Sequence, residues 1–166
     1  MLTAWLVLTI LAPLSQQPAA PAKACSSPEY RQFDFWLGRW DVTGADGRQA
    51  GTNEILRAHN GCVLIENWNG VRGMTGTSLN MYVASDKQWQ QTWMDSAGSL
   101  LVLRGGLRGA SMVMTGRALQ PGAPPSLDRI TWTPNPDGSV RQLWESSSDE
   151  GKTWKVMFDG RYVRSR

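Results

Sequence analysis

Tryptophans that alternate with amide or carboxyl side chains are the residues of this chain best suited to chemistry. Nine tryptophans occur among 166 residues, and several share a predicted strand face with a polar group. Large aromatic rings with a few hydrogen-bonding groups are typical of a cavity that binds a small molecule. We therefore expect eight residues to contact a ligand: Glu66, Trp68, Asn80, Tyr82, Gln91, Trp93, Gln142 and Trp144. The alternative is that each tryptophan only fills the core, with its indole N–H bonded to a neighbour.

The sequence supplies no combination of residues that is typical of catalysis or metal binding. His59 is the only histidine, and it adjoins the turn signal Asn60-Gly61. One histidine and two cysteines give no basis for a zinc site, a catalytic triad or a Cys–His pair. Paired carboxylates among Glu54, Glu66 and Asp95 stay open, although no sequence feature brings two of them together. We expect no cofactor and no metal, and a binding protein rather than an enzyme.

These side chains need a scaffold that sets strands side by side, and the chain contains about ten candidate strands at spacings of about 8 to 12 residues. The predicted strands are 39–44, 49–58, 62–69, 74–84, 88–95, 100–105, 111–118, 127–133, 140–147 and 153–164. Short links and the lack of any later helical pattern favour an all-β, antiparallel up-and-down barrel. A barrel of this strand number encloses more room than side chains fill, so we expect a cavity.

Alternation assigns side chains to the two faces of each strand. In 62–69 it sets Glu66 and Trp68 on one face, and the corresponding faces of the next two strands carry Ser78, Asn80 and Tyr82, then Trp89, Gln91, Trp93 and Asp95. In the hairpin 127–147, a turn centred on Pro136-Asp137 would set Arg129 opposite Trp144 as a cation–π pair. The same register pairs Thr131 with Gln142 and Trp132 with Arg141. Both faces of this hairpin mix polar and apolar groups, so its inward face stays open.

Residues 147–154, Ser-Ser-Asp-Glu-Gly-Lys-Thr-Trp, resemble the Asp-box turn of sialidase propellers. A single copy without internal repeats cannot build a propeller. We therefore expect only a turn, in which Asp149 accepts bonds from turn amides, Gly151 takes a positive φ and Trp154 packs over the turn.

The stretch 33–43, FDFWLGRWDVT, joins a predicted short helix to the first strand. Ser27-Pro28-Glu29 is a helix-start signal, and Gly38 ends the helix, whose apolar face is suited to cap a barrel end. Gly38-Arg39-Trp40 is similar to the opening of lipocalin and calycin barrels. With GCVLIENWNG, WTPNPDGSVRQLWESS and FDGRY, the chain resembles, over about residues 25–166, an exported bacterial family of uncharacterised function with a lipocalin-like or nitrobindin-like barrel. This resemblance implies a fold rather than a function, and His59 at a loop tip does not fit the haem histidine of such relatives.

The first 24 residues predict export. Residues 2–14 form an uncharged apolar run that is too short to span a bilayer as an ordinary helix. A spacer rich in Pro, Ala and Gln follows, and Ala22-Lys23-Ala24 is a small-x-small cleavage site. We predict a signal peptide over 1–24 and a mature barrel domain over 25–166, periplasmic or secreted, with no stable membrane insertion after cleavage. Ahead of the apolar run, however, the only positive charge is the terminal amine.

Cys25 and Cys62 are the only cysteines, and we expect them to form a disulfide in an exported chain. Two alternatives are an inert buried thiol at Cys62 and a lipid anchor at Cys25. The formal charge of +3 is small, and no basic cluster accompanies it, so we expect no nucleic-acid partner.

Our leading hypothesis is an exported barrel that binds a small apolar or aromatic molecule. An enzyme acting on a lipid or phenolic substrate at the barrel mouth is one alternative. A structural protein of the cell envelope with a filled core is the other. The sequence does not indicate the oligomeric state.

Overall fold

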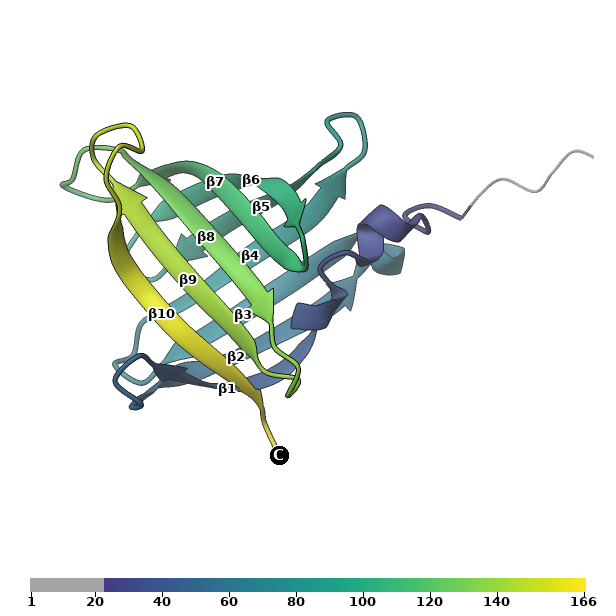
Figure 1. Cartoon of the computed structure of the whole chain (residues 1–166), viewed down its shortest axis with the longest axis horizontal. Coiled ribbons are helices and arrows are strands. Elements are labelled where there is room, and N and C mark those ends of the chain that lie inside the picture. The colour runs from purple at the N-terminus through teal and green to yellow at the C-terminus, as the bar shows by residue number, and fades with distance from the viewer. Residues whose placement is uncertain (1–22) are drawn as a thin grey trace, which may run out of the picture.

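Ten antiparallel strands form a closed barrel in the computed structural model, which describes residues 23–166 (Figure 1). The strands are β1 Gly38–Gly44, β2 Gln49–Ala58, β3 Val63–Gly70, β4 Thr75–Val83, β5 Gln88–Asp95, β6 Leu100–Arg108, β7 Ser111–Leu119, β8 Ser126–Pro134, β9 Val140–Ser147 and β10 Lys155–Arg164. The predicted fold class is confirmed. The predicted signal peptide lies almost wholly outside the described residues.

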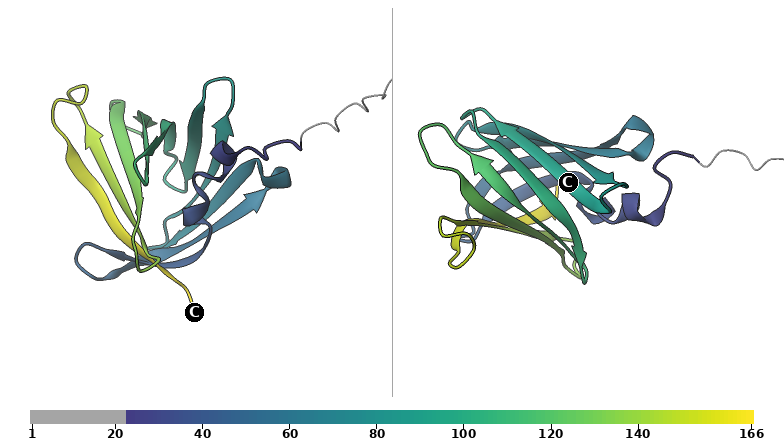
Figure 2. Two further views of the ribbon diagram at one scale, coloured as in Figure 1. Left: turned by 45° about the vertical axis from the view of Figure 1, so that its right-hand side comes forward. Right: turned by 90° about the horizontal axis from the view of Figure 1, so that it is seen from above.

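Each strand pairs with its neighbours in the chain, and β1 pairs with β10 to close the barrel. Trp40 lies opposite Arg164 and Gly44 opposite Gly160 along this seam. Figure 2 shows the curvature of the sheet from two further directions. Closure gives every strand two hydrogen-bonded neighbours and leaves no sheet edge exposed.

The N-terminal segment caps one end of the barrel, as predicted, but it is not a single helix. It forms two 3-10 helices, η1 Pro28–Arg31 and η2 Asp34–Trp36. The Ser27 hydroxyl does not cap the backbone and instead donates to the Glu29 carboxylate, at 2.5 Å. The fully buried rings of Phe33 and Trp36 stack with centroids 4.9 Å apart and reach into the barrel.

The aromatic plug, by which we mean Phe33 and Trp36, packs against two strands that are separated by two others in the barrel. The Phe33 ring meets Trp89 of β5 edge-on at 5.7 Å and Trp132 of β8 at 5.1 Å. Aromatic side chains bury more apolar area than other residues. The plug therefore closes this end with apolar packing, and any open cavity has to lie toward the other end.

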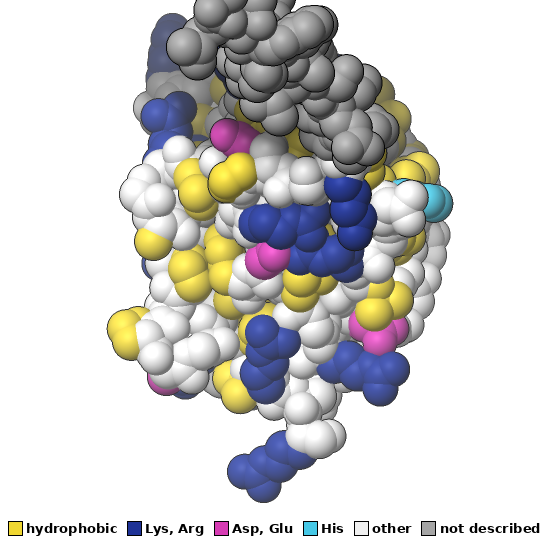
Figure 3. All heavy atoms as spheres, turned by 90° about the vertical axis from the view of Figure 1, so that its right-hand side faces the viewer, with side chains coloured by type: hydrophobic (Ala, Val, Ile, Leu, Met, Phe, Trp, Pro, Cys, Tyr) yellow, Lys and Arg dark blue, Asp and Glu magenta, His cyan; other side chains and the backbone are white. Residues whose placement is uncertain are grey.

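A disulfide between Cys25 and Cys62 fastens the plug segment to the connection between β2 and β3. The predicted disulfide is confirmed, which removes both alternatives for these cysteines. Arg31 strengthens the attachment by donating to the carbonyl oxygens of Cys25 and Gly61. Figure 3 shows this face of the molecule, where Lys and Arg side chains gather near the centre beside acidic ones. An ion pair between Arg57 and Asp34 also joins β2 to η2.

The predicted register of the β8–β9 hairpin is wrong by one residue. Ile130, not Arg129, lies opposite Trp144, and Trp132 lies opposite Gln142. The cause is the turn, which is centred on Asp137 and contains three residues between Asn135 and Ser139. Its glycine, Gly138, has a φ of +80°, which is typical of three-residue hairpin loops. A slip of one residue exchanges the two faces of a strand.

Arg129 consequently points away from Trp144. It forms an ion pair with Glu145 at 2.9 Å, and its guanidinium lies 4.1 Å from the ring centroid of Trp154. The predicted cation–π contact therefore involves a different indole, one that belongs to the Asp-box turn. In that turn Asp149 accepts bonds from the Thr153 amide at 2.8 Å and from its hydroxyl at 2.6 Å, so the structural interpretation of the motif is confirmed.

Candidate ligand cavity

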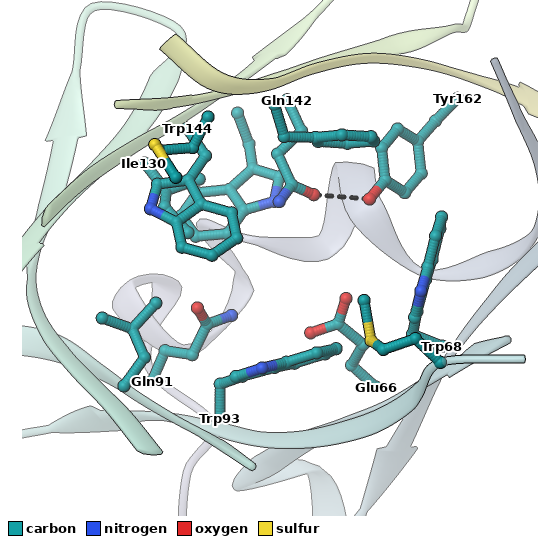
Figure 4. A pocket seen from close by; sticks show the side chains of 13 residues that line it. Glu66, Trp68, Gln91, Trp93, Ile130, Gln142, Trp144 and Tyr162 are labelled. Atoms are coloured by element: carbon teal, nitrogen blue, oxygen red, sulfur yellow. Dashed lines mark hydrogen bonds between the residues drawn. The ribbon is translucent and has the colours of Figure 1, made fainter. Parts of the chain in front are cut away.

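A cavity of about 230 Å³ occupies the half of the barrel that faces away from the aromatic plug. Its rim includes Met74, beside the β3–β4 turn, and Met157, near the start of β10. These two side chains are 42% and 47% exposed, so the cavity opens to solvent at this end. Figure 4 shows its walls from close by.

Six of the eight predicted ligand contacts line the cavity: Glu66, Trp68, Gln91, Trp93, Gln142 and Trp144. Asn80 and Tyr82 share a strand face with them but are not among its lining residues. Asn80 is fully buried and donates to the Ser78 hydroxyl at 2.8 Å. Tyr82 lies nearer the plug, where its ring meets that of Tyr30 edge-on at 5.3 Å.

Glu66 is the carboxylate of the cavity wall, and its side chain is almost completely buried. It accepts hydrogen bonds from the Asn53 amide at 2.7 Å and from the Ser78 hydroxyl at 2.6 Å. Burial raises the pKa of Glu66 from 4.5 to about 7, although both hydrogen bonds favour the charged form. A carboxyl group with this pKa changes its charge near neutral pH.

The hydrogen bonds continue from Glu66 through Ser78 and Asn80 to Gln91. The Gln91 amide nitrogen donates to the Asn80 side-chain oxygen at 2.8 Å. The Gln91 amide and the Glu66 carboxylate point into the cavity from the same wall (Figure 4). Because its nitrogen is already engaged, the Gln91 oxygen is the atom this amide offers to a ligand.

Gln142 and Tyr162 form the polar part of the opposite wall (Figure 4). The Tyr162 hydroxyl donates to the Gln142 side-chain oxygen at 2.5 Å. Burial and the nearby Glu66 charge raise the pKa of Tyr162 well above 10, so this hydroxyl stays protonated. The Gln142 amide nitrogen is then the donor that this wall offers to a ligand.

Two of the cavity indoles are held by aspartates. Trp144 donates its N–H to the buried Asp128 at 2.6 Å, and Trp93 donates to Asp95 at 3.1 Å. By contrast, the N–H groups of Trp68 and Trp132 are buried without a hydrogen-bond partner in the described chain. Both nitrogen atoms have almost no accessible surface, so they do not offer a donor to a molecule in the cavity.

Sequence reasoning missed several lining residues: Leu101, Ile130, Trp132, Phe158 and Tyr162. Phe158, Gly160 and Tyr162 lie on the same face of β10. Strand alternation would therefore have predicted all three on the inner face once any one of them was assigned to it. The error in the β8–β9 register hid Trp132 and Ile130, because it set Arg141 rather than Gln142 opposite Trp132.

The described residues do not form a metal site. Within residues 23–166, no group of three His, Cys, Asp or Glu side chains is placed to hold a metal ion. His59 lies in the short 3-10 helix η3 His59–Gly61, exposed and outside the cavity lining. What the site can do is enclose a small molecule between aromatic faces and offer it acceptors on one wall and a donor on the other.

Comparison of the sequence with protein-family models and with curated proteins gave no match. In the part of the chain that the structure describes, no helix has the length and apolar character needed to cross a membrane.

Proposed function

We propose that this protein binds a small, largely apolar or aromatic molecule inside its barrel. The observation that carries the proposal is the cavity of about 230 Å³, walled by four indole rings and by the polar groups of Glu66, Gln91 and Gln142. A dry cavity of about 150 Å³ accommodates a benzene molecule. The ligand is therefore a molecule of one or two rings, or an aliphatic chain of similar volume.

The cavity is also accessible from solvent, because Met74 and Met157 at its rim are partly exposed. The same cavity speaks against the filled core that a purely structural envelope protein would have.

An enzyme acting on a small phenolic or lipid substrate is the second candidate, because of one observation. Glu66 lies in the cavity wall with a pKa of about 7, where a carboxyl group can both give and take a proton. Turnover of a phenolic ester by the protein, lost in the Glu66→Gln variant, would favour this candidate over simple binding.

We further propose that the protein is exported and that its barrel is related to the lipocalin-like family that its motifs resemble. The apolar run at 2–14 and the Cys25–Cys62 disulfide support export, because disulfides persist mainly in oxidising compartments. Cell fractionation, with mass spectrometry of the mature N-terminus, tests this. Processing at Cys25 is expected, whereas unprocessed protein with free thiols in the cytoplasm would contradict export.

The binding proposal is tested by native mass spectrometry of protein purified from its own compartment. We expect a retained small-molecule mass that is lost on denaturation, together with quenching of tryptophan fluorescence by small aromatics. The matched variants are Trp93→Ala, in the cavity wall, and Trp154→Ala, in the Asp-box turn outside it. Binding should weaken only in the first. A clean mass without ligand, and titrations that leave the fluorescence unchanged, would refute the proposal.

A further inference from the structure

We infer that the molecule held in the cavity is a protonated amine with an aromatic or apolar body, and that Glu66 receives its ammonium group. This inference rests on the proposed binding function and narrows it to one class of ligand. It follows from the distribution of charge around the cavity rather than from its size.

The first observation is that the charge of Glu66 has no counter-charge. Its two partners, Asn53 and Ser78, are neutral, and the lining residues of the described chain include no Lys, Arg or His. A buried carboxylate without a cation is costly, and proteins usually pair such groups. A cationic ligand would supply the missing counter-charge beside the buried carboxylate and so reduce the free-energy cost of burying it.

The second observation is that the ion pairs of the protein lie outside the cavity. Eight ion pairs occur among residues 23–166, each joins an arginine to a carboxylate, and none includes a cavity-lining residue. Glu66, Asp95 and Asp128 take part in none of them, and neither do three carboxylates away from the cavity, Glu29, Asp41 and Asp149. The net charge of the protein is positive, yet three carboxylates without cationic partners surround or adjoin its cavity.

The third observation concerns the aromatic walls. Trp144 and Trp93 direct their N–H edges to Asp128 and Asp95, so their positive edges are already engaged. The faces of such rings carry negative charge density, and indole is the best of the aromatic side chains for binding a cation. Aromatic faces around a single carboxylate therefore form a site that suits an ammonium group and rejects an anion.

The polar groups near Glu66 are all neutral, so none of them competes with a cationic ligand for its charge. It is approached by Asn53 from β2, Ser78 from β4 and Tyr162 from β10, with Gln91 of β5 beside it on the same wall. Of these only Tyr162 titrates, and its raised pKa keeps it neutral. Ammonium binding should therefore expel a proton from Glu66 at neutral pH, with affinity increasing as the pH rises through about 7.

The test compares three ligands of one shape: 2-phenylethylamine, 2-phenylethanol and phenylacetate. Calorimetry at a pH above 7 should show the amine binding at least about tenfold more tightly than the alcohol, a difference of about 1.4 kcal/mol. Phenylacetate should bind more weakly than the alcohol. Equal or tighter binding of the alcohol would overturn the amine inference and leave the binding proposal standing. Failure of all three to bind, with no retained ligand in native mass spectrometry, would overturn both.

The variant Glu66→Gln keeps the shape of the side chain and should reduce the preference for the amine to less than about twofold. Glu54→Gln is the matched control, because Glu54 faces outward on β2 and pairs with Arg39. This control should retain the preference. Proton release by the wild-type protein, measured by calorimetry in buffers of different ionisation enthalpy, gives a readout that needs no variant. Amine binding without proton release at pH 7, or a preference that survives Glu66→Gln, would refute the role of Glu66.

Discussion

The side-chain amide of Asn53 on β2 donates a hydrogen bond of 2.7 Å to the carboxylate of Glu66 on β3, and both groups are buried. The two residues are not register partners, since Asn53 lies opposite Trp68 and Ile55 lies opposite Glu66. The bond is thus a diagonal contact across the inner face of the sheet. It is one of only two side-chain hydrogen bonds that the described chain donates to Glu66, so the charged form depends on it.

Replacing Asn53 with alanine should destabilise the barrel by about 1 to 3 kcal/mol, because a buried acceptor loses its donor. The pKa of Glu66 should rise further above its ordinary value, since one of two groups that favour the charged form is gone. Urea unfolding at neutral pH measures the first effect, and infrared spectroscopy of the carboxyl group measures the second. Asn67→Ala, on the opposite face of β3, is the control and should change neither quantity appreciably.

The stability of the protein should depend on the protonation of Glu66. Its pKa rises from the ordinary value of 4.5 to about 7 in the folded chain, so between these values the native state binds more protons than the unfolded state. Stability from this group is therefore fully present below about pH 4.5 and is lost as the pH rises through about 7. The difference between the two pKa values corresponds to about 3 kcal/mol.

Glu66→Gln should remove this dependence and flatten the curve of unfolding free energy against pH between about 4.5 and 7. Burial also raises the pKa of Asp34, so the share of Glu66 is the difference between the wild-type and variant curves. Asp137 and Asp149, held by hydrogen bonds from their own turns, have pKa values lowered to about 2, and they act below pH 4. A wild-type curve that rises through the window, or a variant curve that falls as steeply as the wild-type curve, would show that Glu66 is not the responsible group.

Much of the barrel could be predicted from the sequence because alternation is a local property. One face of β3, β4 and β5 is buried, so the period of two placed Glu66, Gln91 and Trp93 inside correctly. What alternation does not give is the height of a residue along the barrel axis. Asn80 and Tyr82 share the inner face but lie outside the lining of the open half.

The register of the β8–β9 hairpin could not be obtained in the same way. It depends on the number of residues in the turn, and Asn135 to Ser139 contains signals for more than one turn type. Hydrogen bonds from the Ser139 amide and hydroxyl to Asp137 select the three-residue form. These contacts arise only after the chain has turned. The length of this turn therefore decides which residues of β8 and β9 lie opposite one another in the cavity wall.

Loss of the Cys25–Cys62 disulfide should weaken the closure of the plugged end. The bridge closes a loop of 37 residues, for which loop-closure entropy predicts a stabilisation of about 4 kcal/mol. The double variant Cys25→Ser, Cys62→Ser should lower the unfolding free energy by up to this amount. Wild-type protein in reducing buffer is the matched comparison and should unfold at the same denaturant concentration as the variant. Equal stability of the oxidised and reduced proteins would contradict the predicted role.

The shape of the cavity should depend on Gly76 of β4, because the Trp93 ring lies against its backbone. A Cβ atom at Gly76 would sit 2.2 Å from Cζ2 of Trp93, so the ring has to move in Gly76→Ala. Overpacking of this kind costs about 1 to 3 kcal/mol. Affinity for an aromatic ligand should fall by about tenfold as the displaced ring changes the cavity.

Gly106→Ala is the control for this substitution, since a Cβ atom there meets nothing within 4 Å. Calorimetry with 2-phenylethylamine and thermal unfolding should be measured on both variants. The Gly106 variant should match the wild type in both, whereas the Gly76 variant should remain folded and bind more weakly. If Gly76→Ala left affinity unchanged while destabilising the fold, the ligand would not lie against Trp93. The binding site would then have to be sought on the opposite wall, around Gln142 and Trp144.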